Sequence, residues 1–394
     1  MNNIHDYVTF ADSTLAQAWT GKKVPMSDVY EAYIDGKLDI PSDKWNAFFD
    51  ARNETMSFRI TDSHLKWAVT NFIPEVFIHS KDQDKRVVGD NYNRGNDFYN
   101  WFLGESMVYT SAWFQTPETK LEQAQYAKID HCCDKLMLKP GETLLDIGCG
   151  WGTFVARAAK ERGVQSLGVC LAEEQVAFGR ERIKAYGVED KARVEVRDYR
   201  NVTGKFDKIV SLEMVEHVGI KNLDTYFEKV HDLLANDGLF VLRWTGIRNL
   251  YNPQNPISAL TLAPEDLIWG LFMNRYIFPG ADASLPLSSM LRAAEKAGFE
   301  IADVENMSPH YVRTLSDGPP SRGCFSRARL FGTRGDDPVQ RWNARWRAGE
   351  PPKPRRAATW SRGRGCDVMS STAVRYRTPS STADQVVPRS RSRR

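Results

Sequence analysis

At 394 residues, with 42% hydrophobic and 26% charged residues, the chain has the material of a soluble globular protein with one large core or two moderate cores. Its six cysteines lack the paired spacing of zinc ligands, and no window reaches the about 18 apolar residues that cross a bilayer, so neither a structural metal nor a membrane-spanning helix is predicted. The net charge of +3 hides a division, because residues 1–315 carry nine more acidic than basic side chains and residues 316–394 carry twelve more basic ones.

Residues 1–105 are predicted to form a helical N-terminal segment, in which large aromatic residues are spread among charged ones. No motif in this segment indicates a chemistry. Residues 121–136 then show an amphipathic helical pattern that ends before Pro140 and Gly141, and they lead into a second domain, which we place at 106–315.

Short apolar segments alternate with helical stretches in this second domain. The predicted strands are residues 143–149, 166–172, 193–199, 208–215 and 238–244. Such alternation predicts an α/β fold with a doubly wound, mostly parallel sheet, whose ligand crevice lies beyond the carboxyl ends of the strands.

Two stretches interrupt or end this pattern. Residues 246–298 are long and aromatic, and we interpret them as a lid or substrate-binding insert before a strand resumes at "FEIADVENM". From Ser316 onward the chain holds 17 Arg against one Lys, many Pro, Gly and Ser residues, and no periodicity. We therefore expect residues 316–394 to be a disordered tail.

The turn "LLDIGCGWG" between the first predicted strand and the next helix is a candidate nucleoside-binding loop. Gly148 and Gly150 permit a tight turn and close backbone approach to a ligand, and Asp146 can fix the loop or meet a cationic group. Gly152 completes a spacing that differs from the GxGxxG of dinucleotide sites, and no Walker lysine follows. The loop favours S-adenosylmethionine over a nicotinamide cofactor.

The next two strand ends also carry suitable polar groups. In "VCLAEEQ", the acceptor for ribose hydroxyls could be Glu173, Glu174 or Gln175, although a carboxylate there could simply begin a helix. In "RDYRN", Asp198 can accept from an adenine amine and Tyr199 can lie against the adenine ring.

The fourth strand ends in "SLEMVEHVG", where two proton-handling groups, Glu216 and His217, follow an apolar run. A solvated strand end is the alternative interpretation. Because this end lies beside the predicted donor loop, we interpret Glu216 as a catalytic group and His217 as its support.

These motifs, together with "YTSAWF" at 109–114 and "NRYIFPGADAS" at 274–284, resemble the cyclopropane-fatty-acid synthase and mycolic acid methyltransferase family. "VTFADSTLAQAWTGKKVPMSD" is most similar to the fungal sphingolipid C-9 methyltransferases within it. The resemblance covers residues 1 to about 315. It implies a class I S-adenosylmethionine-dependent methyltransferase fold and methyl transfer to a lipid alkene, at C-9 of a Δ8-unsaturated sphingoid base in ceramide or glucosylceramide.

The resemblance also implies site residues. Donor contacts would fall on Tyr109, Thr110, Asp146, Gly148, Cys149, Gly150, Gly152, Leu171, Gln175, Asp198 and Tyr199. Family members hold a bicarbonate ion as base beside the donor methyl, and Glu216 and Tyr311 match two of its ligands. Ser111, Arg243 and Thr245 stand where the family has a Cys, a His and an Ile backbone.

The chemistry explains why an alkene methyltransferase needs such a site. An isolated alkene is a weak nucleophile, and the carbocation it leaves must lose a proton in a dry pocket with one placed base. Loss from the methylated carbon gives a methyl branch, and loss from the new methyl group closes a cyclopropane. Aromatic faces that could stabilise the cation are Trp113, Phe114, Trp269, Phe272, Tyr276 and Phe278.

Other functions stay open from the residues alone. The chain could be a cyclopropane-fatty-acid synthase, a small-molecule N- or O-methyltransferase that uses Glu216 and His217 as its base, or an inactive donor-binding remnant. Nucleic-acid binding by the basic tail is not expected, because the aromatic and basic platform of an RNA-binding module is missing.

The resemblance implies the endoplasmic reticulum membrane, and relatives carry membrane-spanning segments ahead of the matched region. With no such segment here, we expect a cytoplasmic or peripheral membrane protein that meets its lipid at the membrane surface. Family members also continue past "HYVRTL" with Trp-rich helices and a last strand, where this chain has its Arg-rich tail. We therefore predict that the C-terminal strand is missing, through a shifted reading frame or a missed intron.

Overall fold

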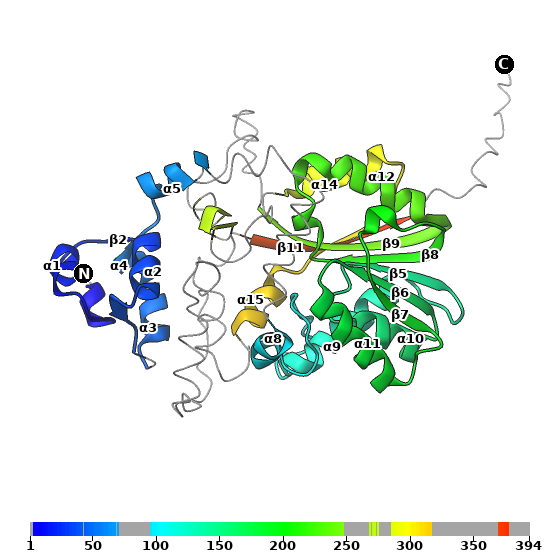
Figure 1. The fold of residues 1–394 in the computed structure, drawn as a ribbon. Coiled ribbons are helices and arrows are strands. Elements are labelled where there is room, and N and C mark those ends of the chain that lie inside the picture. The colour runs from blue at the N-terminus through cyan, green and yellow to red at the C-terminus, as the bar shows by residue number, and fades with distance from the viewer. Residues whose placement is uncertain are drawn as a thin grey trace, which may run out of the picture.

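The computed structural model describes residues 3–41, 43–67, 69–70, 95–247, 268, 270–272, 274–275, 285–316 and 369–377. A central sheet with helices on both faces forms the larger part, and a small helical body lies to one side of it (Figure 1). None of the helices within these ranges has the length and apolar character needed to cross a membrane.

Seven strands of the described residues form the central sheet, in the order β10-β11-β9-β8-β5-β6-β7. Strands β5 to β9 pair in parallel, which confirms the predicted doubly wound sheet. The bounds are β5 Thr143–Ile147, β6 Gln165–Cys170, β7 Ala192–Val196, β8 Phe206–Leu212, β9 Leu234–Ile247, β10 Glu300–Asn306 and β11 Met369–Arg377.

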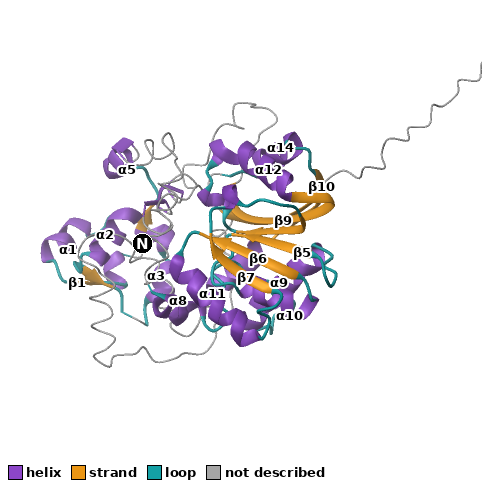
Figure 2. Ribbon diagram, turned by 45° about the vertical axis from the view of Figure 1, so that its right-hand side comes forward, coloured by secondary structure: helices purple, strands orange, loops and turns teal. Residues whose placement is uncertain are grey.

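Helices cover both faces of the sheet, as Figure 2 shows. On one face lie α12 (Leu223–Leu233) and α14 (Leu287–Lys296), and on the other lie α9 (Leu121–Lys135), α10 (Thr153–Arg162) and α11 (Glu173–Tyr186). Adjacent strand residues serve opposite cores, since Leu145 packs with α12 and Leu144 with α9 and α10. This double burial explains the continuous apolar runs of the strands.

Strand β11 corrects the prediction that the C-terminal strand is missing. Residues Met369–Arg377 lie between β9 and β10 and run antiparallel to both, with Ala373 opposite Arg243. Without an intervening strand, the facing backbone groups of β9 and β10 would have no partner, and an inserted strand satisfies both rows. The disorder expected for 369–377 is therefore wrong, and the rest of 316–394 lies outside the described residues.

Tyr376 anchors β11 in the core. Its side chain is fully buried, and its ring centroid lies 5.4 Å from that of Phe240 and 5.6 Å from those of Phe227 and Phe299. The Arg-rich composition around it hid this strand, because one buried aromatic residue is a weak signal in a basic segment.

The described part of the N-terminal segment consists of short helices and two-residue strands, and it has its own apolar core. Its helices are α1 Ser13–Trp19, α2 Met26–Ile34, α3 Trp45–Asp50, α4 Arg52–Thr55 and α5 Asp62–Trp67, with two-residue strands β1 Thr9–Phe10, β2 Val24–Pro25, β3 Leu38–Asp39 and β4 Met56–Ser57. Ile268 and Phe272 of the predicted insert pack into this core, and Arg275 Nη2 donates to Glu31 Oε1 at 2.8 Å. Most of the insert, including Trp269, Tyr276 and Phe278, lies outside the described residues.

We predict that Tyr376→Ala lowers the free energy of unfolding by about 3–5 kcal/mol, because it removes a large buried ring from a packed core. The Tyr376 hydroxyl has no hydrogen-bond partner among the described residues, so Tyr376→Phe should change stability by less than about 1 kcal/mol. Urea unfolding followed by tryptophan fluorescence measures both. Equal stability of the Ala variant and the parent would show that β11 is not part of the core.

Candidate functional site

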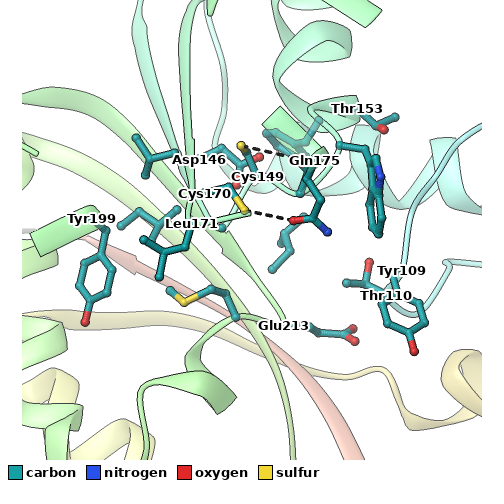
Figure 3. Close-up of a pocket in the computed structure, with 18 of the residues that line it drawn as sticks. Tyr109, Thr110, Asp146, Cys149, Thr153, Cys170, Leu171, Gln175, Tyr199 and Glu213 are labelled. Atoms are coloured by element: carbon teal, nitrogen blue, oxygen red, sulfur yellow. Dashed lines mark hydrogen bonds between the residues drawn. The ribbon is translucent and has the colours of Figure 1, made fainter. Parts of the chain in front are cut away.

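A cavity opens where strands β5, β6, β7 and β8 end, as the fold predicts (Figure 3). Residues that directly follow each of these strands line its wall. Ten of the eleven predicted donor residues line it: Tyr109, Thr110, Asp146, Gly148, Cys149, Gly150, Leu171, Gln175, Asp198 and Tyr199. The sequence therefore located the cavity and most of its wall.

Gly150 leaves room for a ligand at the tip of the loop. Its backbone has φ +51°, and a Cβ built there would have no heavy atom within 4 Å. The space that a side chain would fill thus belongs to the cavity. Backbone bonds from Gly148 N and Cys149 N to Val169 O, at 2.9 and 3.2 Å, hold the loop against β6.

Gly152 is the predicted donor residue that does not line the cavity. It precedes α10 with φ +73°, and a Cβ there would lie 3.0 Å from Gly179 Cα. Glycine at this position allows the loop to approach α11 closely, so the structure gives Gly152 a packing role.

Of the three candidate ribose acceptors, Gln175 is the one that lines the cavity. Gln175 is 4% exposed and lines the cavity, whereas Glu173 and Glu174 are exposed at the start of α11. The Cys170 thiol donates to Gln175 Oε1 at 3.1 Å, which fixes the orientation of the amide. The two glutamates fit the alternative interpretation, a helix start that favours negative charge.

Asp198 and Tyr199 stand together after β7. Arg200 donates to Asp198 through Nε at 2.8 Å and Nη2 at 2.6 Å, so the carboxylate is charge-balanced at the cavity wall. The Tyr199 ring packs edge-on against Tyr226, with centroids 5.6 Å apart. These contacts hold both side chains in place before any ligand binds.

Lys128 is a cavity residue that the sequence analysis missed. It is 1% exposed, and its Nζ donates to Thr110 Oγ1 at 2.5 Å. Burial, together with the positive charge of the nearby Arg243, lowers its pKa to about 8. The available signal was its position, because Lys128 falls between Ala124 and Cys132 on the apolar face of the predicted helix.

Asp146 lies beside Lys128 at the end of β5. Burial raises the pKa of Asp146 to about 7, and the positive charge of Lys128 opposes this shift. A buried acid and a buried base with displaced pKa values at one cavity are typical of a functional site.

The five predicted catalytic residues do not converge on one point. His217 lines the donor cavity, whereas Tyr311, on α15 (Ser308–Ser316), lines a second cavity that shares Val108, Tyr109 and Thr110 with the first. Glu216 is 8% exposed, does not line either cavity, and accepts from Thr245 N at 2.6 Å through Oε1. Strand β8 also ends at Leu212 rather than at 215, so Glu216 and His217 belong to a 3-10 turn, Val215–His217.

Ser111 and Arg243 do meet, and they meet at a residue that was not predicted. Arg243 Nη2 donates to Ser111 Oγ at 2.5 Å, and both side chains are buried. Glu213 Oε1 accepts from Ser111 N at 3.1 Å and from Ser111 Oγ at 3.3 Å. Glu213 lines the donor cavity, and its signal was a carboxylate inside the apolar run "SLEMV".

Two of the groups implied to hold bicarbonate are already paired within the chain. The hydrogen bonds that Ser111 would give to an anion go to the Glu213 carboxylate, and the Thr245 N–H donates to Glu216. Within the described ranges, no group of His, Cys, Asp and Glu side chains could hold a metal ion.

Two aromatic residues predicted to face a cation lie elsewhere. The Trp113 ring stacks on His131 with centroids 4.2 Å apart, and the Arg313 guanidinium lies 4.0 Å from the Phe114 centroid. Neither lines the donor cavity. Phe272 packs edge-on against Tyr30 in the N-terminal core, with centroids 5.1 Å apart.

Comparison with known proteins gives consistent results. Residues 79–318 match the family of mycolic acid cyclopropane synthetases. The chain is 41% identical to a sphingolipid C9-methyltransferase of Komagataella phaffii, over 79% of this chain and 64% of that protein. It is 42% identical to a sphingolipid C9-methyltransferase of Candida albicans, over 75% of this chain and 57% of that protein. The chain thus spans less than two thirds of each of these relatives.

Solved structures support the fold. A cyclopropane synthase of Mycobacterium tuberculosis superposes with a TM-score of 0.60 at 24% identity, over 75% of this chain and 98% of that one. A coclaurine N-methyltransferase superposes with a TM-score of 0.58 at 17% identity, over 89% of this chain and 98% of that one. The sheet and its helices are therefore those of class I methyltransferases.

We predict different effects for two glycine substitutions that share backbone strain. Gly187→Ala, at φ +66° with no atom within 4 Å of the new Cβ, should cost about 1 kcal/mol of unfolding free energy. Gly152→Ala should cost about 1–3 kcal/mol more, because its Cβ would press on Gly179 Cα. Urea unfolding measures both, and equal losses would contradict the packing role of Gly152.

We predict a pH dependence of stability from Asp146. Its pKa is about 7 in the folded protein and 3.8 ordinarily, so between these values the folded state binds a proton that the unfolded chain releases. The contribution of Asp146 to stability is full below its unfolded pKa and is lost as the pH rises through its folded pKa. Asp146→Asn should flatten this fall in urea midpoints measured from about pH 4 to 8. The exposed Asp190→Asn is the control, and a slope that survives in Asp146→Asn would refute the assignment.

Proposed function

Because the chain belongs to the mycolic acid cyclopropane synthetase family, we propose that it transfers a methyl group from S-adenosylmethionine to C-9 of a Δ8-unsaturated sphingoid base in ceramide or glucosylceramide. The observation that carries this proposal is the cavity at the carboxyl ends of β5 to β8, lined by ten predicted donor residues. The names of the fungal relatives support the substrate class, since they are sphingolipid C9-methyltransferases.

The cavity wall suits the three parts of the donor. The Gln175 amide can bind the ribose hydroxyls, and Asp198 can accept from the adenine amine while Tyr199 lies beside the ring. Lys128 and Asp146 place one basic and one acidic group at the same end of the cavity. This pair complements the carboxylate and ammonium groups of the methionine part.

The bound donor supplies an electrophilic methyl group. The chain must hold the lipid double bond next to this group and exclude water. Tyr109 packs edge-on against Tyr99 and Phe102, with centroids 5.7 Å from each, and so holds an aromatic wall beside the donor cavity. The second cavity, lined by Leu103, Tyr311 and Leu315 among others, shares this wall and is mainly apolar. We assign it to the alkyl chain next to the reacting double bond, with Tyr311 at its side.

We also propose that the protein reaches its lipid by peripheral contact with a membrane, in the endoplasmic reticulum as the resemblance implies. Ile60, Leu65 and Val69, in or beside α5, are 42%, 56% and 64% exposed. Apolar side chains of this kind can enter the boundary between headgroups and acyl chains.

Lipid mass spectrometry tests the proposed function. In a host that makes Δ8-unsaturated ceramides but has no C9-methyltransferase, expression of the chain should add one methylene to the sphingoid base. Gln175→Ala should raise the donor KM about tenfold, because one hydrogen bond to the donor is lost. Ozonolysis of the product should give a methyl ketone fragment if the double bond survives as a methyl branch, and no such fragment if a cyclopropane forms.

Three outcomes would contradict it. A cyclopropane product would favour the cyclopropane-fatty-acid synthase. Turnover of a soluble amine or phenol without any change in lipids would favour a small-molecule methyltransferase. Donor binding without turnover of any lipid would identify an inactive donor-binding protein.

A further inference from the structure

We infer that the Glu213 carboxylate is the proton acceptor of this reaction and stands in place of an exogenous anion. The inference rests on the proposed function. It adds a catalytic residue that lies three positions before Glu216, the carboxylate that the sequence favours.

Glu213 lies at the end of β8, in the wall of the donor cavity. It follows Leu212, the last residue of β8, and lines the donor cavity with Met214 and His217. Figure 3 shows its carboxylate extended toward Tyr109 and Thr110, across the cavity from Tyr199. A base in this place faces the same space as the predicted donor residues.

The hydrogen bonds that Glu213 accepts from Ser111 involve only one of its two carboxylate oxygens. Both bonds from Ser111, at 3.1 and 3.3 Å, go to Oε1. These bonds orient the carboxylate, and the cavity is the direction left for Oε2. A base that is oriented through one oxygen and presents the other is the usual arrangement of a catalytic carboxylate.

Two buried, positively charged side chains lie near the Glu213 carboxylate. Arg243 is 1% exposed and donates to Ser111 Oγ, the group that also donates to Glu213. Lys128 is equally buried, and the negative charge of Glu213 raises its pKa against the effect of burial. Two buried cations need negative charge nearby, and Glu213 supplies part of it together with Asp146, the other carboxylate of the described cavity wall that acts on Lys128.

The backbone conformation of Glu213 is energetically unfavourable. Glu213 has φ +53°, in the left-handed region that favours glycine. Its N–H donates to Arg243 O at 2.8 Å, which holds the strained conformation against β9. Strain of this kind in a non-glycine residue at a cavity indicates a function for the side chain.

Glu216 serves instead as a positioning residue. Its Oε1 accepts a hydrogen bond from Thr245 N at 2.6 Å, near the carboxyl end of β9, and Glu216 does not line the donor cavity. This bond joins the turn that carries His217 to β9. Glu216 therefore fixes the turn that follows Glu213 against β9.

The reaction step balances with Glu213 as the only base. The π electrons of the alkene form the bond from C-9 to the methyl carbon as the sulfur–carbon bond breaks, which leaves a thioether and a cation at C-8. Glu213 accepts the proton from C-9, and that C–H electron pair restores the double bond. The protonated carboxyl group then releases its proton to solvent.

Steady-state kinetics with the full chain test this assignment. Glu213→Gln should lower kcat by about 10²–10⁴-fold, the usual contribution of a general base, with the donor Kd unchanged within about threefold. Glu181→Gln, at an exposed glutamate of α11, is the matched control and should keep the parent rate. The parent rate should not change when bicarbonate is removed from the buffer.

Chemical rescue separates a base from a structural residue. Glu213→Gly relieves the left-handed strain, which offsets part of the loss of its buried carboxylate, and urea unfolding measures whether the variant is folded before its turnover is assayed. Added bicarbonate or acetate should restore part of its turnover, whereas Glu213→Gln should not be rescued. By calorimetry in the presence of S-adenosylhomocysteine, bicarbonate should bind to Glu213→Gly and not to the parent.

The outcomes are distinguishable. An active parent whose Glu213→Gln variant keeps its rate, or a parent that binds and requires bicarbonate, overturns this assignment alone. A parent that binds the donor but methylates no sphingolipid overturns the proposed function and this assignment with it.

Discussion

The parallel register of β8 and β9 is the constraint on which the site depends. It sets Leu212 opposite Arg243, and the next residue, Glu213, bonds back to Arg243 O. Ser111 then reaches both the Arg243 guanidinium and the Glu213 carboxylate. A shift of β9 by one residue would turn Arg243 to the opposite face of the sheet, away from Ser111.

The same register depends on the far side of β9. Strand β11 pairs along β9, with Ala373 opposite Arg243 and Ser371 opposite Thr245. Since Thr245 N donates to Glu216, the backbone of β9 supports the turn after β8 while β11 completes its pairing. The C-terminal strand thus contributes to the order of the site although none of its residues lines the donor cavity.

Burying charged side chains at and near the cavity costs desolvation free energy, so their presence there indicates a function. Lys128, Asp146 and Arg243 are each at most 2% exposed, and desolvation shifts the pKa of the first toward 8 and that of the second toward 7. An apolar core without these groups would avoid the desolvation cost. Lys128 and Asp146 line one cavity, as the proposed zwitterionic donor requires, and Arg243 contacts Ser111 outside the cavity lining.

The sequence by itself determined the sheet, the glycine loop and most of the donor wall. Strand periodicity, Gly148 and Gly150, and the polar residues Asp198 and Gln175 are local signals, and parallel strands bring their carboxyl ends to one edge. Only the tertiary structure decided which carboxylate faces the cavity. Glu213 and Glu216 lie on one short run, and the choice between them depends on contacts with Ser111 and Thr245, each at least 29 residues away.

The tertiary structure also decided the roles of Lys128, Gly152 and β11. A lysine on an apolar helix face, a third glycine in a loop and a strand within a basic tail each have several local interpretations. Lys128 acquires its meaning from Asp146 and Thr110, Gly152 from Gly179, and Tyr376 from a core built by residues far earlier in the chain. Such long-range packing is not encoded in spacing or composition, because it exists only once the chain has folded.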